Sequence, residues 1–499
     1  MQHMSIDIET KSSVDIKKAG LYKYAQSPDF KLLLFAYKMD DDTVQIIDLA
    51  MGEDIPIDIL EALRSPSVVK HAYNAAFEWY CLNRAGYVTP IGQWQCTMVH
   101  GLYCGYPAGL ERAGEALGLP QDKQKMTAGK ALIKYFCVPC KPTRTNGGRS
   151  WNLPKHAPEK WKLFKEYCRQ DVVTENAILK RLSPFPMPAD EERLWQMDVY
   201  MNAFGVRVDT ELLEGALYIN AISEQKLLEE AVALTGLANP NSDKQLADWL
   251  REKTGEEVPD MQKATVLKML GRNYPKDVHR MLEIRQQMKK TSVEKYTTME
   301  ISKCKDDRIR GVTQFYGAGR TGRWAGRMVQ MQNLPRNYIK TLDYARKTVK
   351  KKNYGGLKLL YGNVPDTLSQ LIRTAFIPSE GNHFVVADFS AIEARVIAWL
   401  AGEQWVNEVF ATHGKIYEAT ASQMFHVPIE KIVKGNPEYS LRQKGKVATL
   451  ALGYQGSKSA LIQMGALEMG LTEEELPDIV QRWRNANPRI RDLWASVQQ

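Results

Sequence analysis

The sequence has no apolar run long enough to span a bilayer and no leader with a charged start and an apolar middle, so we expect a soluble protein. Its 7 cysteines form no regular framework, which argues against a disulfide-stapled secreted domain and fits a reducing compartment. No internal repeat or low-complexity tract is visible, which excludes a solenoid. Acidic residues are in slight deficit, and the formal net charge of +9 weakly favours a polyanionic partner.

A chain of 499 residues is too long for one ordinary core, so two or more domains are expected. The proline-rich segment from Ser183 to Pro188 breaks both helix and strand. We therefore predict a domain boundary there.

Polar and apolar residues alternate near the start of the chain. In the segment from Ser5 to Thr10, Asp7 and Glu9 share one face of a predicted strand, and Ile6 and Ile8 point to the other. Two carboxylates on one face repel each other, and a cation between them relieves that repulsion. For these residues alone, an exposed acidic strand edge is an equally good interpretation.

Further acids follow on other predicted elements. Glu78 lies in a helix that follows a short strand-like run, and Tyr167 and Asp171 lie one helical turn apart. A pair of divalent metal ions requires about this number of carboxylates, and the Tyr167 hydroxyl could orient a water molecule. The candidate metal ligands are Asp7, Glu9, Glu78 and Asp171.

Basic residues dominate two segments in the middle of the chain. Residues 278–296 are predicted to form one amphipathic helix, whose apolar face packs in a core and whose basic side chains are available to phosphates: Arg285, Lys289, Lys290 and Lys295. Residues 316–323 are rich in glycine and arginine, which indicates either a phosphate-binding loop or a flexible surface loop.

The organising segment lies beyond the middle of the chain. The apolar run Phe384 to Ala387 ends at Asp388, after which Ile392, Val396 and Leu400 recur at helical spacing. This pattern predicts a buried strand that turns into a helix and presents the Asp388 carboxylate at the strand end. The alternative is an aspartate that only caps the following helix.

A second stripe follows at steps of four residues: Arg442, Lys446, Leu450 and Tyr454. On a helix these side chains share one face, with two cations at one end and an aromatic ring at the other. Cations that hold phosphates and a ring that stacks on a base suit a nucleoside triphosphate. A basic, solvated helix face is the alternative.

The two segments together resemble motifs A and B of the family A DNA polymerases, here Asp388-Phe389-Ser390-Ala391-Ile392-Glu393-Ala394-Arg395 and Arg442-x3-Lys446-x7-Tyr454. The resemblance implies that Asp388 and the Phe389 carbonyl bind metal ions and that Glu393 stands beside the sugar and excludes a 2′-hydroxyl.

In motif B the resemblance implies that Arg442 and Lys446 hold the incoming phosphates and that Tyr454 lies near the template base. Leu450 stands where most family members have Phe or Tyr, so stacking on the nucleotide is lost there. His413 would help to hold pyrophosphate, and a lone surface histidine is the alternative.

The N-terminal acids resemble the three motifs of the proofreading 3′–5′ exonucleases: Asp7-x-Glu9, Asn74-x2-Phe77-Glu78 and Tyr167-x3-Asp171. Glu78 departs from the commonest form, in which Asp occupies this position. Its side chain is one methylene longer but keeps the charge, so we expect an active exonuclease.

Segments between these motifs resemble the primer-contacting parts of the family. Arg323 would touch the minor groove near the primer end, and Arg336 would lie nearer the triphosphate. Gln332 and Asn333 belong to the same segment, and Lys289 and Lys290 would contact DNA phosphates. A segment from Asn241 to Leu246 resembles a helix opening of the thumb, with Ser242 as the N-cap.

These resemblances predict an α/β protein with a ribonuclease-H-like exonuclease domain (1–185), the start of the palm and the thumb (186–340), and palm motif A with the fingers (341–499). They imply DNA-dependent DNA synthesis with proofreading, two Mg²⁺ ions per site with Mn²⁺ as a substitute, and partners that are primer-template DNA, a single-stranded 3′ end and dNTPs. The segment from Lys446 to Tyr454 looks like the phage-encoded branch, which places the protein in the cytoplasm of a host cell and away from the membrane.

The His-Asp-Glu turn that carries a second catalytic Asp in the family does not occur in the sequence. We therefore expect that a second polypeptide supplies the remaining palm, that the chain is a fragment, or that it polymerises poorly or not at all. Two rival functions stay open: a Mg²⁺-dependent 3′–5′ exonuclease whose other domains only hold DNA, and a non-catalytic primer-template binding subunit.

Overall fold

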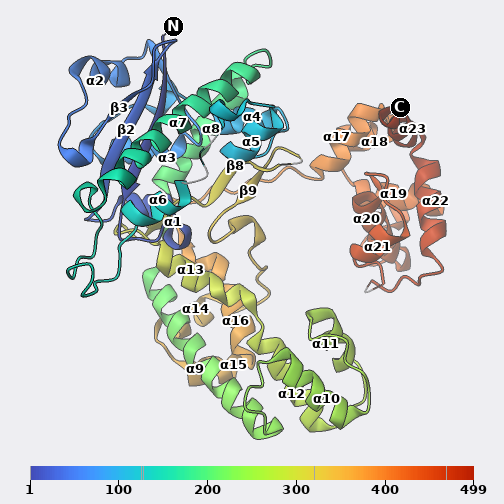
Figure 1. Cartoon of the computed structure of the whole chain (residues 1–499). Helices are drawn as coiled ribbons and strands as arrows, with labels where there is room; N and C mark the ends of the chain where they lie inside the picture. Colours follow the sequence, from blue (N-terminus) through green and yellow to red (C-terminus); the bar gives the residue numbers. More distant parts are fainter. Residues whose placement is uncertain (1, 125, 127–128, 320, 468) are drawn as a thin grey trace. The chain divides into compact units, whose positions relative to one another are not determined.

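A computed structural model describes residues 2–124, 126, 129–319, 321–467 and 469–499 (Figure 1). The chain divides into two compact units, Met1–His383 (unit 1) and Phe384–Gln499 (unit 2). All 7 cysteines are free. In the described ranges, no helix combines the length and the apolar character that a membrane crossing requires.

Unit 1 begins with a five-stranded sheet of order β3-β2-β1-β4-β5. The strands are β1 (Gln2–Lys11), β2 (Lys31–Met39), β3 (Gln45–Ile47), β4 (Val68–Ala72) and β5 (Trp94–Cys96). β1 pairs with β2 in antiparallel and with β4 in parallel register. Because side chains alternate along β1, Met4, Ile6 and Ile8 are buried in the main core, while Asp7 and Glu9 face the other side.

In the part of this region that the structure describes, seven helices accompany the sheet: α1 (Ile16–Ala25), α2 (Ile57–Arg64), α3 (Ala76–Arg84), α4 (Thr97–Tyr103), α5 (Leu110–Ala116), α6 (Gly129–Phe136) and α7 (Pro158–Leu182). The long helix α7 crosses the sheet over β1 and β2 (Figure 1). Its Trp161 and Phe164 pack with Phe136 of α6 in a separate buried cluster. This packing fixes α7 over the acidic face of β1.

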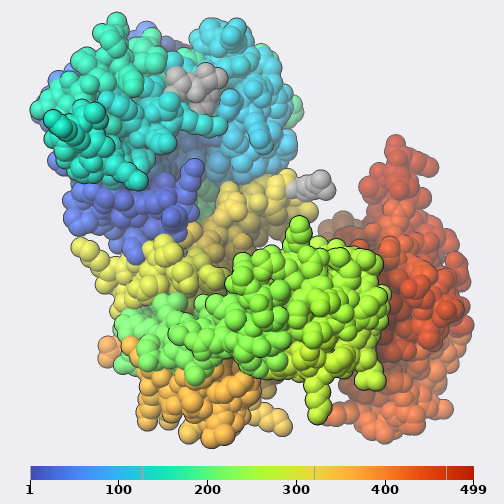
Figure 2. All heavy atoms as spheres, turned by 60° about the horizontal axis from the view of Figure 1, so that its bottom comes forward, coloured from blue at the N-terminus to red at the C-terminus, as the bar shows by residue number. Residues whose placement is uncertain are grey.

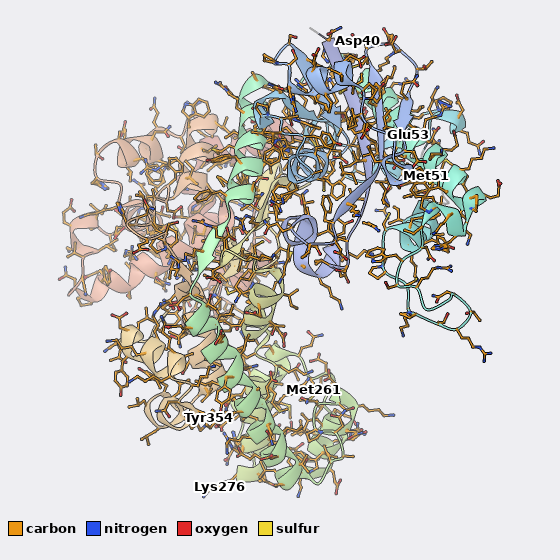
Figure 3. All side chains as sticks on the ribbon, turned by 90° about the vertical axis from the view of Figure 1, so that its left-hand side faces the viewer. Asp40, Met51, Glu53, Met261, Lys276 and Tyr354 are labelled. Atoms are coloured by element: carbon orange, nitrogen blue, oxygen red, sulfur yellow. The ribbon has the colours of Figure 1, made fainter. Side chains whose placement is uncertain are left out.

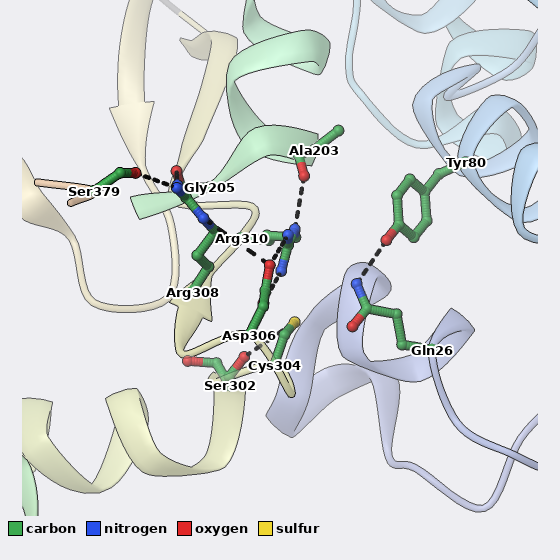
Figure 4. A network of polar contacts seen from close by, with 10 residues as sticks. All are labelled: Gln26, Tyr80, Ala203, Gly205, Ser302, Cys304, Asp306, Arg308, Arg310 and Ser379. Atoms are coloured by element: carbon green, nitrogen blue, oxygen red, sulfur yellow. Dashed lines mark hydrogen bonds and ion pairs between the residues drawn. The ribbon is translucent and has the colours of Figure 1, made fainter. Parts of the chain in front are cut away.

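The proline-rich segment separates α7 from α8 (Ala189–Phe204). Two small sheets follow: β6 (Val206–Val208), β7 (Arg308–Ile309) and β10 (Phe376–Ile377), and a hairpin of β8 (Thr313–Ala318) and β9 (Arg323–Gly326). Polar contacts join these strands to the end of α8 (Figure 4): Arg310 donates to the Ala203 carbonyl and to Asp306, and Arg308 donates to the Gly205 carbonyl.

The rest of unit 1 is helical: α9 (Thr210–Thr235), α10 (Asp243–Thr254), α11 (Lys263–Leu270), α12 (Lys276–Met288), α13 (Glu294–Ser302), α14 (Leu342–Lys350), α15 (Tyr354–Tyr361) and α16 (Val364–Leu371). The α10–α12 helices enclose one core with the second half of α9, and α13–α16 enclose another with the first half of α9. The surface of α10–α12 is yellow-green in Figure 2. Met261 and Lys276 mark the first group in Figure 3, and Tyr354 marks the second.

Two expectations for this region have different outcomes. Ser242 is the N-cap of α10, as predicted, and its side chain accepts a hydrogen bond from the Gln245 amide at 3.4 Å. The single helix predicted over 278–296 is wrong, because α12 ends at Met288 and α13 begins at Glu294. Apolar spacing runs through both helices, so it does not reveal the break between them.

Unit 2 contains seven helices in its described residues: α17 (Ile392–Ala401), α18 (Gln404–Ala411), α19 (Ile416–Phe425), α20 (Leu441–Leu452), α21 (Lys458–Gln463), α22 (Leu476–Ala486) and α23 (Pro488–Gln498). Its core lies mainly between α19, α20 and α22 and includes Met424, Val447 and Trp483.

Candidate active sites

The N-terminal acids come from three elements that meet at one face of the sheet. Asp7 and Glu9 project from β1, Glu78 lies in the first turn of α3, and Asp171 lies on α7. Burial raises the pKa of the Glu78 carboxyl well above its ordinary value, and the nearby charges of Asp7 and Asp171 raise it further. The structure therefore gathers carboxylates whose negative charges oppose the ionisation of Glu78.

Tyr167 lies one turn before Asp171, and its ring lies against the start of α6. A Cβ atom on Gly129 would come within 2.1 Å of the Tyr167 ring, so α6 begins directly against that ring. Burial raises the pKa of the Tyr167 hydroxyl above its ordinary value, and Asp171, to which it is hydrogen-bonded, raises it further. The hydroxyl therefore stays protonated and donates its proton to Asp171, while its oxygen can still accept a hydrogen bond.

Sequence reasoning missed two thiols beside these acids. The Cys168 thiol donates to Asp7 Oδ2 at 3.3 Å, and the Cys137 thiol lies 4.0 Å from Glu9 Oε2. Burial and the neighbouring carboxylate raise the pKa of each thiol well above its ordinary value. Both thiols are therefore neutral hydrogen-bond donors that help to orient the neighbouring carboxylates. The position of Cys168, next to Tyr167 in the motif, is the only signal the sequence offers.

Glu175 was also missed. It lies one turn after Asp171 on α7, is 2% exposed, and accepts a short hydrogen bond from the Thr97 hydroxyl. Burial raises the pKa of the Glu175 carboxyl to about 7, against the opposing effect of the Thr97 and Ser5 hydroxyls. The i, i+4 spacing from Asp171 places both residues on one helix face, which is a signal that the sequence contains.

The donor set of this site suits a hard divalent cation. Such ions prefer carboxylate oxygens, and a cation would relieve the mutual repulsion of these acids. Glu78 Oε2 is buried and lacks a hydrogen-bond partner among the described residues. Among the described residues, no three or more His, Cys, Asp or Glu side chains are arranged so that they could hold a metal ion as they stand. The residues fit the ions in chemistry and charge.

The predicted buried strand before Asp388 is wrong. No strand forms over 384–389 in unit 2, and the side chains of Val385 and Val386 are 85% and 90% exposed. A strand is stable only when neighbouring backbone satisfies its N–H and C=O groups, and none of the described strands pairs with this segment. Asp388 is therefore an exposed carboxylate on irregular backbone.

The helix predicted after Asp388 is present as α17 and begins at Ile392, so Glu393 lies exposed in its first turn. The predicted apolar stripe is not its buried face, because Ile392, Val396 and Leu400 are each at least 44% exposed. Ala398 is the buried residue of this helix and packs towards α18 and α19 with Val406 and Ile416.

The basic stripe lies on α20, which crosses α19 very closely. A Cβ on Gly445 would come within 2.2 Å of the Tyr417 carbonyl oxygen, so only glycine permits this approach. Arg442 donates to Glu418 Oε1 of α19 at 2.7 Å, whereas Lys446 forms no ion pair with a described residue. Leu450 is 36% exposed, at the edge of the same face.

Tyr454 does not share that helix, contrary to the prediction, because α20 ends at Leu452. It lies in the following turn and is 61% exposed. His413 is exposed before α19, and its Nδ1 accepts a hydrogen bond from the Lys415 amide at 3.1 Å. It borders a cavity of about 350 Å³ with Trp405, Glu408 and Gln423.

The glycine-rich segment predicted as a loop is largely the β8–β9 hairpin, with Arg323 exposed at the start of β9. Residue 320 lies outside the described ranges. Gln332, Asn333 and Arg336 are exposed in and after a short 3-10 turn. The backbone at Tyr316, Met328 and Gln330 is left-handed, a conformation that costs about 1–3 kcal/mol and concentrates at functional segments.

Of the four basic side chains predicted to face phosphates from 278–296, only Lys289 is exposed and forms no ion pair with a described residue. Arg285 is 3% exposed and paired with Asp243 at 2.6 Å. Lys290 is paired with Asp366 at 2.6 Å, and Lys295 donates to the Val329 carbonyl at 2.5 Å. These three side chains therefore make contacts within the protein: Arg285 and Lys290 reach helices α10 and α16, and Lys295 reaches the segment after β9.

Comparison with known proteins gives consistent results. Residues 219–499 match the model of DNA polymerase family A. Over its whole length the chain is 56% identical to a DNA polymerase of Bacillus phage SP02, of which it spans 76%. It is 26% identical over 339 residues to DNA polymerase I of Borreliella burgdorferi, of which it spans 32%. The fold resembles the POL domain of Pol1 from M. smegmatis in complex with DNA primer-template and dNTP, with a TM-score of 0.58, 18% identity, and coverage of 98% of this chain and 74% of that chain.

Proposed function

The chain belongs to DNA polymerase family A, and from that premise we propose that it takes part in template-directed DNA synthesis and removes 3′-terminal nucleotides by a 3′–5′ exonuclease activity. The observation that supports the exonuclease most strongly is the meeting of Asp7, Glu78 and Asp171 from three separate elements around one buried face. The mixed five-stranded sheet beneath them is compatible with the predicted ribonuclease-H-like domain.

In the proposed exonuclease, each residue has a role that follows from its position. Asp7, Glu9, Glu78 and Asp171 would hold divalent magnesium ions, which supply an activated water and stabilise negative charge on the phosphate when bound. The protonated Tyr167 hydroxyl, which donates to Asp171, would orient the attacking water by accepting a hydrogen bond from it. Glu78 would replace the more common aspartate, because its carboxyl group keeps the same charge and lies in the first turn of α3.

For the polymerase site we propose that Arg442 and Lys446 bind the triphosphate, that Glu393 stands beside the sugar, and that Asp388 with the Phe389 carbonyl provides metal ligands. Leu450 offers no ring for stacking. Arg323, Arg336, Gln332, Asn333 and Lys289 would contact DNA, since all are exposed. Because Asp388 lies on unpaired backbone, we propose that this chain by itself extends primers slowly or not at all.

A single assay tests these functions. The purified chain is incubated with a 5′-labelled primer-template, Mg²⁺ and dNTPs, and the products are resolved by length. We expect shortening without dNTPs, and we expect that Asp388→Ala removes whatever extension occurs with dNTPs. Extension with no shortening would contradict the exonuclease assignment, and a gel shift with neither product would favour a non-catalytic DNA-binding subunit.

A further inference from the structure

One ion pair in unit 2 lies inside the proposed triphosphate site. Helices α19 and α20 approach so closely at Gly445 that Glu418 of one helix reaches Arg442 of the other. The Thr449 hydroxyl also donates to the Thr420 hydroxyl at 3.1 Å, further along the same contact. The relative position of the two side chains is therefore set by helix packing.

The Arg442 side chain is enclosed on several sides. Its Nε donates to Glu418 Oε1 at 2.7 Å, and its guanidinium carbon lies 5.4 Å from the Tyr417 ring centroid and 6.0 Å from that of Tyr439. The Arg442 and Glu418 side chains are 30% and 15% exposed. Charges that are partly withdrawn from water attract each other more strongly than a pair on an open surface. The Glu418 hydrogen bond raises the pKa of Arg442 above its ordinary value.

A carboxylate and a phosphate are equivalent partners for a guanidinium. Both present anionic oxygens that accept hydrogen bonds from its N–H groups. A phosphate that binds Arg442 therefore has to share the guanidinium with Glu418 or displace Glu418 from it. Lys446, one turn further along α20, forms no ion pair with a described residue. One of the two proposed phosphate-binding cations is thus neutralised before the nucleotide arrives.

We propose that Glu418 is a positioning residue. Its carboxylate holds the Arg442 guanidinium until the phosphates of a nucleoside triphosphate displace that carboxylate. The inference rests on the proposed role of Arg442 and Lys446 in triphosphate binding. Glu418 keeps the guanidinium oriented and weakens the binding of every anionic ligand. A triphosphate overcomes this competition because it carries more charge than a monophosphate and reaches Lys446 as well.

Two variants of the full chain test the proposal. Bound to primer-template, each is titrated with dNTP by calorimetry, and dNMP is titrated in parallel. Glu418→Gln removes the charge and nearly preserves the shape, and we expect its Kd for dNTP to fall by at least about fivefold, equivalent to about 1 kcal/mol. Glu430→Gln is the matched control, because it removes one exposed charge from unit 2 and we expect an unchanged Kd.

A double-mutant cycle locates the effect. In an Arg442→Ala background, Glu418→Gln should change the Kd for dNTP by less than about twofold, because the cation for which both anions compete is gone. Equal tightening in both backgrounds would overturn the proposal, since a general gain in positive potential would then explain it. If Glu418→Gln lowers the melting temperature, Glu418→Asp serves as a second variant. It keeps the charge but shortens the side chain by one methylene, so its Kd for dNTP should lie between those of the wild type and Glu418→Gln.

The outcomes distinguish a failure of the Glu418 proposal from a failure of the proposed triphosphate site. If Arg442→Ala weakens dNTP binding while Glu418→Gln leaves the Kd unchanged or raises it, the role of Glu418 is refuted and the triphosphate site stands. If dNTP binding is the same in the wild type and in Arg442→Ala, or is absent from both, the proposed triphosphate site fails and the role of Glu418 fails with it.

Discussion

The carboxylates of the two candidate sites lie in opposite environments. Glu9, Glu78 and Asp171 are between 5% and 8% exposed and come from a paired strand and two packed helices. Asp388 lies on an exposed, irregular segment beside Phe389, which is 78% exposed. The first group is held rigidly at a cost in electrostatic energy, whereas the second carboxylate is unconstrained by its surroundings. The first region is therefore the better preorganised of the two for the metal site that we propose there.

The largest expected effect comes from removing one of the acids of the N-terminal site. Asp7→Ala should lower the rate of single-strand shortening by more than about 100-fold, because even indirect partners of metal ligands cost about 10–100-fold. The rate is measured on a 5′-labelled single strand with Mg²⁺. Asp41→Ala, which removes an exposed acid paired with Lys180, is the control and should keep the wild-type rate. Shortening at equal rates by Asp7→Ala and wild type would refute the site.

A smaller effect should follow from displacing Tyr167 without touching its hydroxyl. Gly129→Ala places a methyl group 2.1 Å from the ring, so the ring or the start of α6 has to move. We expect a loss of about tenfold or more in the shortening rate and a destabilisation of about 1–3 kcal/mol. Gly92→Ala is the matched control, because a Cβ there meets nothing within 4 Å. If both variants behave alike, contact with the ring is not what positions Tyr167.

The third prediction concerns stability and pH. A buried carboxyl whose pKa is raised to about 7 binds its proton more tightly in the folded state, so its contribution to stability is present at low pH and is lost as pH rises from about 4.5 to 7. Without metal ions, Glu175→Gln should therefore be more stable than wild type at pH 8, by about 1–3 kcal/mol, and closer to it at pH 4.5. Denaturant unfolding at both pH values checks this. A difference that is the same at both pH values would contradict the assignment.

The smallest expected effect is at Asp388. Because this side chain is exposed and its segment is unpaired, Asp388→Ala should change the free energy of unfolding by less than about 0.5 kcal/mol. Thermal unfolding of the full chain measures it. Destabilisation by more than about 1 kcal/mol would mean that the carboxylate is held by contacts, and the contrast between the two regions would disappear.

Elements with strong local signals could be predicted from the sequence. The alternation around Asp7, the strand before Glu78 and the helix that carries Tyr167 and Asp171 are all present. The Ser242 cap was also predictable, because a cap depends on a few neighbouring residues. These local features are enough to group the candidate exonuclease residues into one predicted site without any knowledge of tertiary contacts.

Features decided by distant partners could not be predicted in this way. The run from Phe384 to Ala387 has the composition of a strand, but pairing depends on other segments and not on its own residues. Arg285 looks like a phosphate ligand on a helix face, yet tertiary packing buries it against Asp243. The pairing of Glu418 with Arg442 requires the close crossing at Gly445, which no spacing in the sequence reveals.

The most direct test of the N-terminal metal site is an anomalous difference map from crystals of the chain soaked in Mn²⁺. We expect a peak between Asp7 and Asp171, within about 2.5 Å of a carboxylate oxygen, that is lost in Asp7→Ala. A wild-type map with no peak beside these residues would contradict the assignment of the buried carboxylates as metal ligands.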